Sequence, residues 1–390
     1  MRAKQIAVGS FAFLVVAGCS DKSPTISDPG LEYSSATDLF DPGATLGWQA
    51  TARSLVAATP MSPMAAARIY AAVSVAQHKS VMAVNAEHAD VGGRSQFEAR
   101  RGAIAGASAR VLTFFFPGAS VAIDQQLTAE ADATPGDVHP HFVVGLAIGH
   151  AAGDASVQHV QGDGFTTPWT GTLPVGPGMW VANGPPGAAS LATTTAYFMT
   201  TPSQFRPAPP PAYLSPDFNT ALAEVTKYSV NRTPAQVTFA QDWNYPPGTV
   251  TPPGYFNTVA AQLIVEAGLD EAATAEVFAL MHAAFFDALI GCWDAKFYYN
   301  VLRPSQADPT ITLPIGLPNH PSYPSGHSCG ASAAATVLTH FFPSHAGALA
   351  GIVADAGLSR IIGGIHYSFD ITGGNTIGAA VGQLALATGF

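Results

Sequence analysis

Apolar residues recur at helical spacing over most of this 390-residue sequence, and the strict alternation expected of strands is scarce. In residues 63–84, for example, Ile69, Val73 and Ala76 fall on one face of a helix. Further helices are predicted at residues 95–116, 119–133, 138–160, 217–230, 254–267, 270–302, 326–342, 345–364 and 370–388. We therefore predict an all-α fold of roughly ten helices, a helical bundle built as two packed four-helix-type bundles.

The Pro- and Gly-rich segment 162–216 separates an N-terminal helical half, residues 41–161, from a C-terminal helical half, residues 217–390. A connection of this length without a periodic pattern is uncommon in a compact domain. Its aromatic residues, such as Trp169 and Trp180, indicate that it packs on the body of the protein. Two interpretations stay open: an ordered crossover loop that covers the mouth of a site, and a structural strap that contacts no ligand.

The composition predicts a large buried core and argues against one class of partner. Hydrophobic residues make up 48% of the chain and charged residues only 11%, so disorder is not expected. The net charge is −10 and no block of Lys and Arg alternates with aromatic residues, so we expect no nucleic-acid partner. An acidic chain that binds an anion must gather its cations locally. The positions of its 16 Lys and Arg residues are therefore informative.

Residues 1–19 have the pattern of a bacterial lipoprotein signal peptide. Arg2 and Lys4 form a positive region, the apolar run after them is too short to span a membrane comfortably, and the sequence V-A-G-C that ends at Cys19 is similar to a lipobox. We predict lipidation of Cys19, a tether at residues 20–40, and export to the periplasm or cell envelope, with membrane contact only through the lipid. An ordinary cleaved signal peptide is the alternative, and it also predicts export.

Lys296 and Arg303 are the first candidate site residues. They stand seven positions apart in the predicted helix 270–302, so both would project from one face, which Trp293 shares. The helix is predicted to end at Arg303, because a residue before proline resists the helical conformation. The surrounding sequence is apolar and aromatic, and cations rarely enter such surroundings unpaired.

The sequence P-S-Y-P-S-G-H-S at residues 321–328 opens the next predicted helix. The first backbone N–H groups of a helix lack internal partners, and together with the helix dipole they attract an anion. Ser325 would add a hydroxyl donor, and Gly326 would allow the backbone to approach closely. His327, beside them, can give or take a proton near neutral pH.

A third segment places Arg360 six residues before His366 and Asp370 four residues after it. Arg360 offers a fork of donors for two oxygens of one tetrahedral ion. His366 is a candidate nucleophile or metal ligand, and Asp370 would hold its other ring nitrogen if that turn is helical. A single histidine in apolar sequence is usually structural, but these two neighbours favour a functional role.

The three motifs, K-x6-R-P, P-S-G-H and S-R-x5-H-x3-D in this order, resemble those of the superfamily of type 2 phosphatidic acid phosphatases and vanadium-dependent haloperoxidases. Their flanks look like the soluble bacterial haloperoxidase-like branch. The likeness runs from about residue 190 to the end, and more loosely back to about residue 63. It implies a tetrahedral oxyanion surrounded by residues from all three motifs, with His366 bonded to its central atom. The other residues of this implied cage are Lys296, Arg303, Ser325, Gly326 and Arg360.

The resemblance implies one of two activities at this cage. In the haloperoxidases it holds vanadate, with His366 as the one protein ligand to vanadium. Vanadium(V) polarises hydrogen peroxide as a Lewis acid, and halide attacks to give hypohalous acid. In the phosphatases phosphate would take the same place: His366 attacks the phosphorus of a phosphate monoester to form a phosphohistidine, and His327 protonates the leaving group. Phosphate would therefore compete with vanadate for the site.

We predict a vanadium-dependent haloperoxidase-like enzyme, with His327, His366 and Asp370 as catalytic residues and a secreted acid phosphatase as the alternative. Trp293 and His320 favour the haloperoxidase, because the resemblance implies a halide or outer-sphere position for both. Core packing for Trp293 and a loop position for His320 stay open as the structural alternatives. A non-catalytic phosphate-binding lipoprotein would need neither His327 nor His366.

Cysteine and the remaining histidines add no second site. Cys292 and Cys329 are predicted to be buried free thiols, and neither has the spacing of a zinc site. The remaining histidines, including His282, are scattered, and we expect them to be structural.

Overall fold

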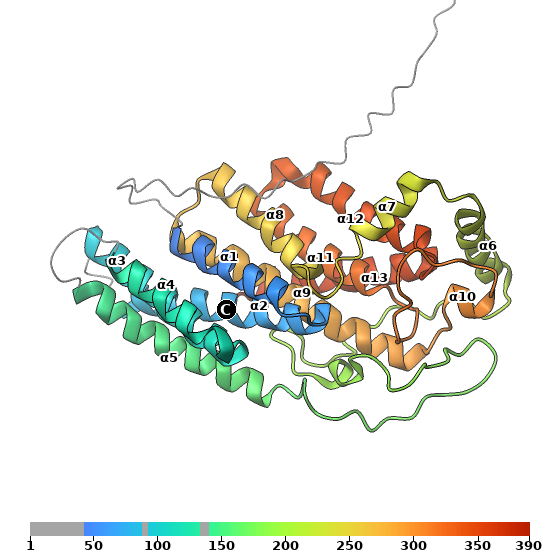
Figure 1. Cartoon of the computed structure of the whole chain (residues 1–390), viewed down its shortest axis with the longest axis horizontal. Coiled ribbons are helices and arrows are strands. Elements are labelled where there is room, and N and C mark those ends of the chain that lie inside the picture. Colours follow the sequence, from blue (N-terminus) through green and yellow to red (C-terminus); the bar gives the residue numbers. More distant parts are fainter. Residues whose placement is uncertain (1–42, 88–92, 133–139) are drawn as a thin grey trace, which may run out of the picture. The chain divides into compact units, whose positions relative to one another are not determined.

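The computed structural model describes residues 43–87, 93–132 and 140–390. This part of the chain contains thirteen α-helices and three short 3-10 helices, and its only β-structure is two isolated bridges (Figure 1). The predicted all-α fold is thereby confirmed. The signal peptide, the lipidated Cys19 and the tether predicted within residues 1–40 lie outside the described residues.

In chain order the elements are α1 (Gly43–Ala58), α2 (Pro63–Glu87), α3 (Arg94–Phe115), η1 (Pro117–Ala119), α4 (Ser120–Asp132), α5 (Pro140–Gly162), η2 (Ala189–Thr193), α6 (Pro216–Asn231), α7 (Pro234–Asp242), α8 (Thr251–Ala267), α9 (Glu271–Tyr299), α10 (Pro304–Ala307), α11 (Gly326–Phe341), η3 (Pro343–His345), α12 (Ala346–Ile362) and α13 (Ser368–Thr388). Most predicted helices lie within a few residues of these bounds. Three helices were not predicted: α1, the nine-residue α7 and the four-residue α10. The last two are too short to show a helical period.

The prediction that one helix carries both Lys296 and Arg303 is wrong. Helix α9 ends at Tyr299, because Asn300 adopts a left-handed conformation with φ 48° and its N–H closes the last turn on the carbonyl of Lys296. Arg303 is extended, with φ −77° and ψ 155°, as expected of a residue before proline. The two cations therefore come from different elements, and helical spacing does not bring them together.

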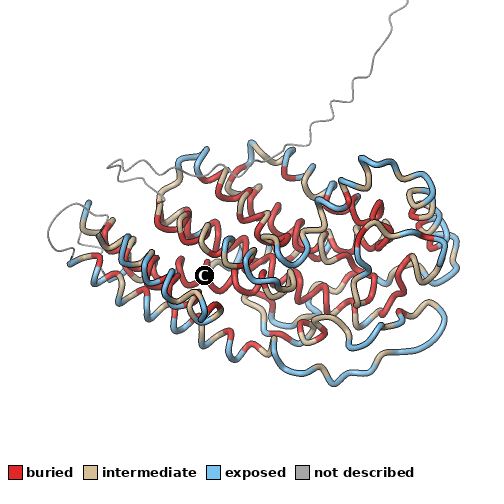
Figure 2. Tube along the Cα trace, viewed as in Figure 1, coloured by how far each residue is buried: buried red, intermediate tan, exposed pale blue. Residues whose placement is uncertain are grey.

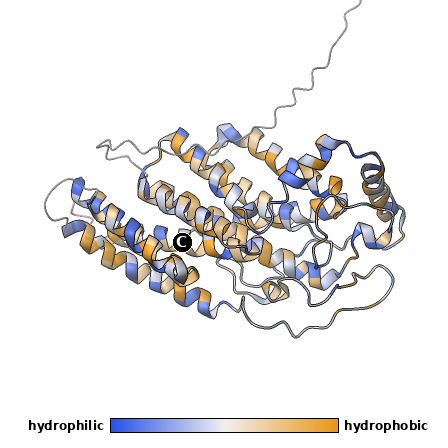
Figure 3. Ribbon diagram, viewed as in Figure 1, coloured by the Kyte–Doolittle hydropathy of each residue, from blue (hydrophilic) through white to orange (hydrophobic). Residues whose placement is uncertain are grey.

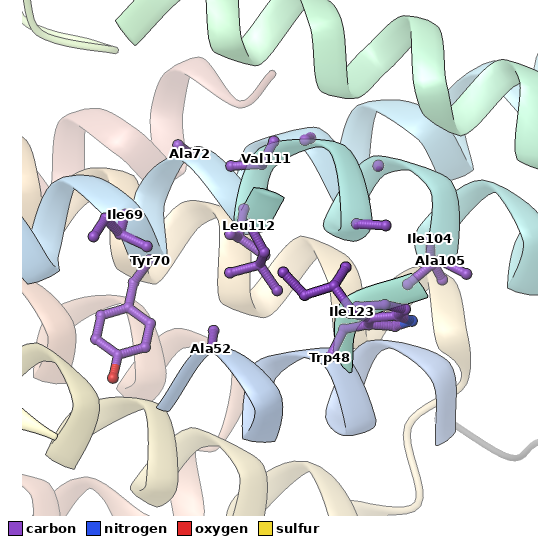
Figure 4. Close-up of a cluster of buried hydrophobic side chains, with 14 of the residues drawn as sticks. Trp48, Ala52, Ile69, Tyr70, Ala72, Ile104, Ala105, Val111, Leu112 and Ile123 are labelled. Carbon is purple, nitrogen blue, oxygen red and sulfur yellow. The ribbon is translucent and has the colours of Figure 1, made fainter. Parts of the chain in front are cut away.

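The first group of helices, α1 to α5, encloses a hydrophobic core. Figure 4 shows Trp48 and Ile104 among the side chains of this cluster, which come from α1 to α5 and include Ala275 of α9. Helices α3 and α5 approach so closely that Gly145 lies against the backbone of Ala99: a Cβ atom built on Gly145 would be 1.9 Å from the Ala99 carbonyl oxygen. The small residues of both helices permit this separation.

The helices from α6 to α13 form the second group, and α9 is its central element. It packs against α2, α8, α11 and α13, so it also joins the two groups of helices. By length and composition α9 is the one helix in the described ranges that could cross a membrane, but 94% of its apolar window is buried inside the protein. Figure 2 shows buried residues along most of this helix, and Figure 3 shows apolar residues along the long helices. These are the properties of a core helix.

The crossover segment 163–215 is anchored to the body at several points. The buried carboxylate of Asp287 in α9 accepts hydrogen bonds from the backbone N–H groups of Tyr197, Phe198 and Met199 at 2.7 to 3.2 Å. The backbone N–H of Trp180 donates to the carbonyl of Asn300 at 2.8 Å. The segment is therefore ordered by contacts with α9 and the chain that follows it.

Candidate active site

The three predicted segments converge at one place, where the end of α9, the start of α11, and the turn between α12 and α13 meet. Lys296 is the last basic residue of α9, Ser325 is the N-cap of α11, and Arg360 lies in the last turn of α12. His366 follows in the turn, and Asp370 lies in the first turn of α13. Six of the predicted site residues are buried in the protein, namely Lys296, Arg303, Ser325, Arg360, His366 and Asp370.

His366 is held in one tautomer by two neighbours. Arg303 Nη1 lies 3.1 Å from His366 Nε2, and an arginine can only donate. Nε2 therefore carries a lone pair, and the ring proton is on Nδ1, which donates to Asp370 Oδ2 at 2.7 Å. Burial, followed by the charge of Arg303, holds the pKa of His366 well below its usual value. The neutral ring thus presents a nitrogen lone pair at Nε2.

Asp370 links His366 to the loop before α11. Besides His366, its Oδ2 atom accepts from the Ser322 hydroxyl at 2.6 Å and from the Tyr367 N–H at 3.1 Å. Burial raises the pKa of Asp370 to about 6, against the lowering effect of these hydrogen bonds. The backbone carbonyl of Asp370 also accepts from the N–H of Ser325 at 2.9 Å. One residue therefore orients both the imidazole and the N-cap of α11.

Lys296 directs all of its donors at backbone carbonyls. Its Nζ atom donates to the carbonyl oxygens of Pro321 and Ser322, each at 2.8 Å, and to that of Pro324. Burial lowers the pKa of Lys296 to about 8, so the amine still carries its charge at neutral pH. Lys296 thus organises the P-S-Y-P turn that leads into α11.

Arg360 is held by a segment that the sequence motifs did not include. Its Nη2 atom donates to the carbonyl of Ala240 at 3.0 Å, and its Nη1 atom to Oδ1 of Asn244 at 3.3 Å. His327 Nε2 lies 3.1 Å from the carbonyl of Trp243, to which it donates. Burial lowers the pKa of Arg360 to about 9 and that of Arg303 to about 10, and both stay charged at neutral pH.

The site has an excess of buried positive charge. In the described ranges, no carboxylate forms an ion pair with Lys296, Arg303 or Arg360. Asp370 is the acid beside them, and its carboxylate accepts a hydrogen bond from Nδ1 of the neutral His366. Buried charges without a counter-charge are costly. An anion bound at this place would relieve that cost.

The start of α11 is exposed to the same space. Gly326 must be glycine or the neighbouring ring must move, because a Cβ atom there would lie 3.2 Å from a ring carbon of Trp293. Ser325 accepts the N–H of Ser328 at 3.4 Å as the N-cap, which leaves its hydroxyl hydrogen available as a donor. Gly326, His327, Arg360 and His366 line one cavity.

This geometry agrees with the comparison with known proteins. The profile of the PAP2 superfamily matches residues 273–390, which contain all three motifs. This segment belongs to the PAP2 superfamily. No curated protein matches the chain in sequence at a significant level.

Three solved structures share the fold over most of the chain. A structure described as the first bacterial vanadium-dependent iodoperoxidase superposes with a TM-score of 0.74 at 22% identity, and covers 89% of this chain and 96% of its own. An apo-type bacterial vanadium-dependent chloroperoxidase gives 0.69 at 17% identity, covering 84% and 94%. A holo-type bacterial vanadium-dependent chloroperoxidase gives 0.66 at 16% identity, covering 85% and 94%. At these identities the likeness establishes the fold, which extends beyond the PAP2 segment into the first group of helices.

Trp293 and His320 lie together beside the PAP2 motifs. Their ring centroids are 4.8 Å apart, and both side chains line the cavity. Trp293 donates its indole N–H to the carbonyl of Gly187 in the crossover segment at 3.2 Å. His320 Nδ1 accepts from Arg303 Nη2 at 3.0 Å, so His320 adjoins the guanidinium that contacts His366. Gly187 lies on the cavity wall, which places part of the crossover segment at its edge.

The PAP2 site is not an ordinary cationic metal site. Among the described residues there is no group of three or more His, Cys, Asp or Glu side chains that could hold a metal ion. Cys292 and Cys329 are buried free thiols, as predicted. The donor set consists of one imidazole nitrogen together with guanidinium, hydroxyl and backbone N–H groups, which suits a tetrahedral oxyanion.

Sequence reasoning missed the segment from Ala240 to Tyr245. It supplies the carbonyls and the amide that hold Arg360 and His327, and Asn244 and Tyr245 line the cavity. The sequence there has neither a motif nor a helical period, although Trp243, Asn244 and Tyr245 form a conspicuous polar and aromatic run before two prolines. That run is the one signal in the sequence that could have pointed to a role for this segment.

Proposed function

We propose that the protein is a vanadium-dependent haloperoxidase-like enzyme that oxidises halide with hydrogen peroxide at a vanadate bound through His366. The observation that carries the proposal is the set of three buried cations without carboxylate partners around an imidazole whose Nε2 lone pair is free of a proton. The shared fold with three haloperoxidase structures supports it.

The residues present fit vanadate. Nε2 of His366 would bind the vanadium, and Arg303, Arg360, Ser325, Gly326 and Lys296 would surround the oxygens, Lys296 by giving up a carbonyl of the P-S-Y-P turn. When bound, vanadate would supply a Lewis acid that activates peroxide toward halide. Asp370 would keep the proton on Nδ1 and orient the ring. His327 would exchange a proton at the cavity through Nδ1, because its Nε2 hydrogen is engaged by the Trp243 carbonyl.

A phosphatase that works through a phosphohistidine at His366 is the second candidate. An unprotonated Nε2 is equally suited to attack phosphorus, and the cations fit phosphate as well as vanadate. In that reaction His327 would protonate the leaving group. A simple phosphate-binding protein would need neither an oriented nucleophile nor His327 in the cavity.

The experiment compares both activities in one preparation. The purified chain is loaded with orthovanadate in phosphate-free buffer and assayed for bromide and iodide oxidation by hydrogen peroxide, and the vanadate-free protein is assayed for hydrolysis of a chromogenic phosphate monoester. We expect vanadate-dependent halide oxidation that is lost in His366→Ala and kept in His340→Ala, a change at an exposed histidine. Ester hydrolysis inhibited by vanadate, without halide turnover, would establish the phosphatase instead.

We also propose that the protein is exported and anchored through a lipid on Cys19. The pattern of residues 1–19 supports this. Mass spectrometry of the mature N-terminus should find a diacylglyceryl cysteine, and Cys19→Ser should release the protein from the membrane fraction. A mature chain that begins at another residue would contradict lipidation at Cys19 and indicate an ordinary cleaved signal peptide.

A further inference from the structure

Asn319 fastens part of the crossover segment to the loop before α11. Its Oδ1 atom accepts the backbone N–H of Asn183 at 2.9 Å, and its Nδ2 atom donates to the carbonyls of Asn183 at 2.9 Å and Pro185 at 2.8 Å. Its own backbone carbonyl accepts the N–H of Gly187 at 2.7 Å. Both N–H groups and the oxygen of this side chain are thus directed at the crossover segment. We call these four hydrogen bonds the Asn319 clasp.

Residues 183–187 depend on hydrogen bonds more than on burial to stay in place. Asn183, Gly184 and Pro185 are exposed. Ala188, which follows the segment, has φ 53°, a left-handed conformation that costs free energy in a residue other than glycine and persists only where its surroundings impose it. An exposed segment with few apolar contacts opens at a low free energy. The clasp therefore controls whether these residues stay in place.

Asn319, His320, Trp293 and Gly187 form a closed ring of contacts at the wall of the cavity. The carbonyl of Gly187 accepts the indole N–H of Trp293 at 3.2 Å, and the centroid of the Trp293 ring lies 4.8 Å from that of His320. His320 follows Asn319 in the chain, and Asn319 leads back to Gly187 through the clasp. A displacement of Gly187 would therefore disturb His320 by two routes.

His320 in turn contacts the cation that adjoins His366. Its carbonyl accepts from Arg303 Nε at 3.0 Å, and its Nδ1 atom accepts from Arg303 Nη2 at 3.0 Å. The Nη1 atom of the same guanidinium lies 3.1 Å from Nε2 of His366. Two contacts along one edge of a guanidinium fix the plane of the group as well as its position. His320 therefore sets the orientation in which Arg303 meets an anion at His366.

We infer that Asn319 is a positioning residue that couples residues 183–187 of the crossover segment to the oxyanion site. With the clasp closed, His320 holds Arg303 in place for the oxyanion. With the clasp open, His320 and Arg303 lose that support and the oxyanion is bound less tightly. Because coupling between two sites is reciprocal, a bound oxyanion stabilises the clasp. The inference rests on the proposed function for the oxyanion at His366, and vanadate and phosphate satisfy it equally.

The first test measures hydrogen exchange at single amides of the full chain, with and without saturating vanadate. The N–H groups of Asn183 and Gly187 donate to Asn319, so both report on the clasp. We expect vanadate to slow their exchange at least about fivefold, since coupling between sites commonly reaches this size. Thr195, in the same segment, is the control: it donates its N–H to the carbonyl of Asp163 at 2.8 Å, and neither residue lines the cavity. Exchange at Thr195 should change less than about twofold, because its local opening is independent of the site.

The second test compares two asparagine substitutions. Asn319→Ala removes the three side-chain hydrogen bonds of the clasp, and it should weaken the binding of vanadate and of phosphate at least about fivefold in equilibrium dialysis. Asn183→Ala is the matched control. Asn183 meets Asn319 through its backbone N–H and carbonyl, so this change keeps the clasp and should alter the affinity less than about twofold. In Asn319→Ala, bound vanadate should also no longer slow exchange at Gly187, a result that a general loss of stability would not produce.

The unaltered chain decides the question even if Asn319→Ala fails to fold. Equal exchange at Asn183 and Gly187 with and without bound vanadate would overturn the inference, and so would a folded Asn319→Ala variant with unaltered affinity for vanadate. Slower exchange without halide oxidation would refute the proposed function alone, whereas halide oxidation with unchanged exchange would refute this inference alone.

Discussion

The imidazole of His366 lies 2.7 Å, from Nδ1 to Oδ2, from the carboxylate of Asp370. Asp370 is in the first turn of α13 and His366 is in the turn before that helix, so the start of the helix sets their separation. Arg303 donates to the opposite nitrogen, so the two contacts together leave Nε2 without a proton. The protonation of the His366 ring therefore depends on Asp370, although Asp370 does not line the cavity.

Asp370→Asn should weaken vanadate binding by roughly 10- to 100-fold, because a neutral amide stabilises the proton on Nδ1 of His366 less than the carboxylate does. Equilibrium dialysis with vanadate measures this. Ser322→Ala is the control, since it removes one hydrogen bond to the same carboxylate and leaves the His366 contact in place. We expect Ser322→Ala to change the affinity by less than about tenfold. Affinity in Asp370→Asn equal to that of the unaltered chain would contradict the proposed role.

Asp287→Ala should loosen the crossover segment. Three backbone N–H groups, at Tyr197, Phe198 and Met199, lose their shared acceptor, and the protein should lose about 2–4 kcal/mol of unfolding free energy. Hydrogen exchange should rise at these three amides, and urea unfolding gives the free energy. Asp355→Ala, at an exposed position of α12, should change neither quantity. Unchanged exchange at residues 197–199 would show that other contacts hold the segment.

Gly145→Ala should destabilise the protein by about 2 kcal/mol or more, because the added Cβ atom would lie 1.9 Å from the backbone oxygen of Ala99 and α3 and α5 would have to separate. Gly47→Ala in α1 is the matched control, since a Cβ atom there meets no atom within 4 Å. That change should stabilise the helix by about 0.5–1 kcal/mol. Urea unfolding of both variants checks the pair, and an equal effect of the two substitutions would refute the close approach.

His282 should make stability depend on pH below neutrality. The ring is buried, it pairs with Asn257 at 2.8 Å, and burial lowers its pKa to about 3. The unfolded chain binds a proton at His282 near pH 6.5 and the folded chain does not. The stabilisation is therefore complete above pH 6.5 and is lost as the pH falls from 6.5 toward 3.

His282→Gln keeps an acceptor for Asn257 and does not titrate. Between pH 7.5 and 5.5 the unaltered chain should lose about 1.4 kcal/mol more unfolding free energy than this variant, as urea unfolding at the two pH values would show. His340→Gln, at an exposed histidine, should retain the full pH dependence. An identical pH dependence in His282→Gln and the unaltered chain would mean that His282 is protonated in the folded protein.

The helical class of the fold and the convergence of the three motifs could be predicted from the sequence. Helix propensity is a local property, and the long Ala-rich segments that became α2, α3 and α9 favour helices directly. The pairing of His366 with Asp370 was predicted for the case of a helical turn, and it forms although His366 lies before the start of α13. The reason given for bringing Lys296 and Arg303 together was wrong, since Asn300 ends α9 between them.

The sequence by itself therefore determined most of the long helices and the kinds of donor that meet at the site. Only the tertiary structure decided how those donors are engaged: Lys296 with three carbonyls of the turn before α11, and Arg360 with the segment around Asn244. It also decided that residues of α2, α8 and α9 would line the same cavity as His366. The physical reason is that spacing along a chain specifies neighbours only within a few residues. Contacts across tens to hundreds of residues depend on how the helices pack, and close packing selects their partners.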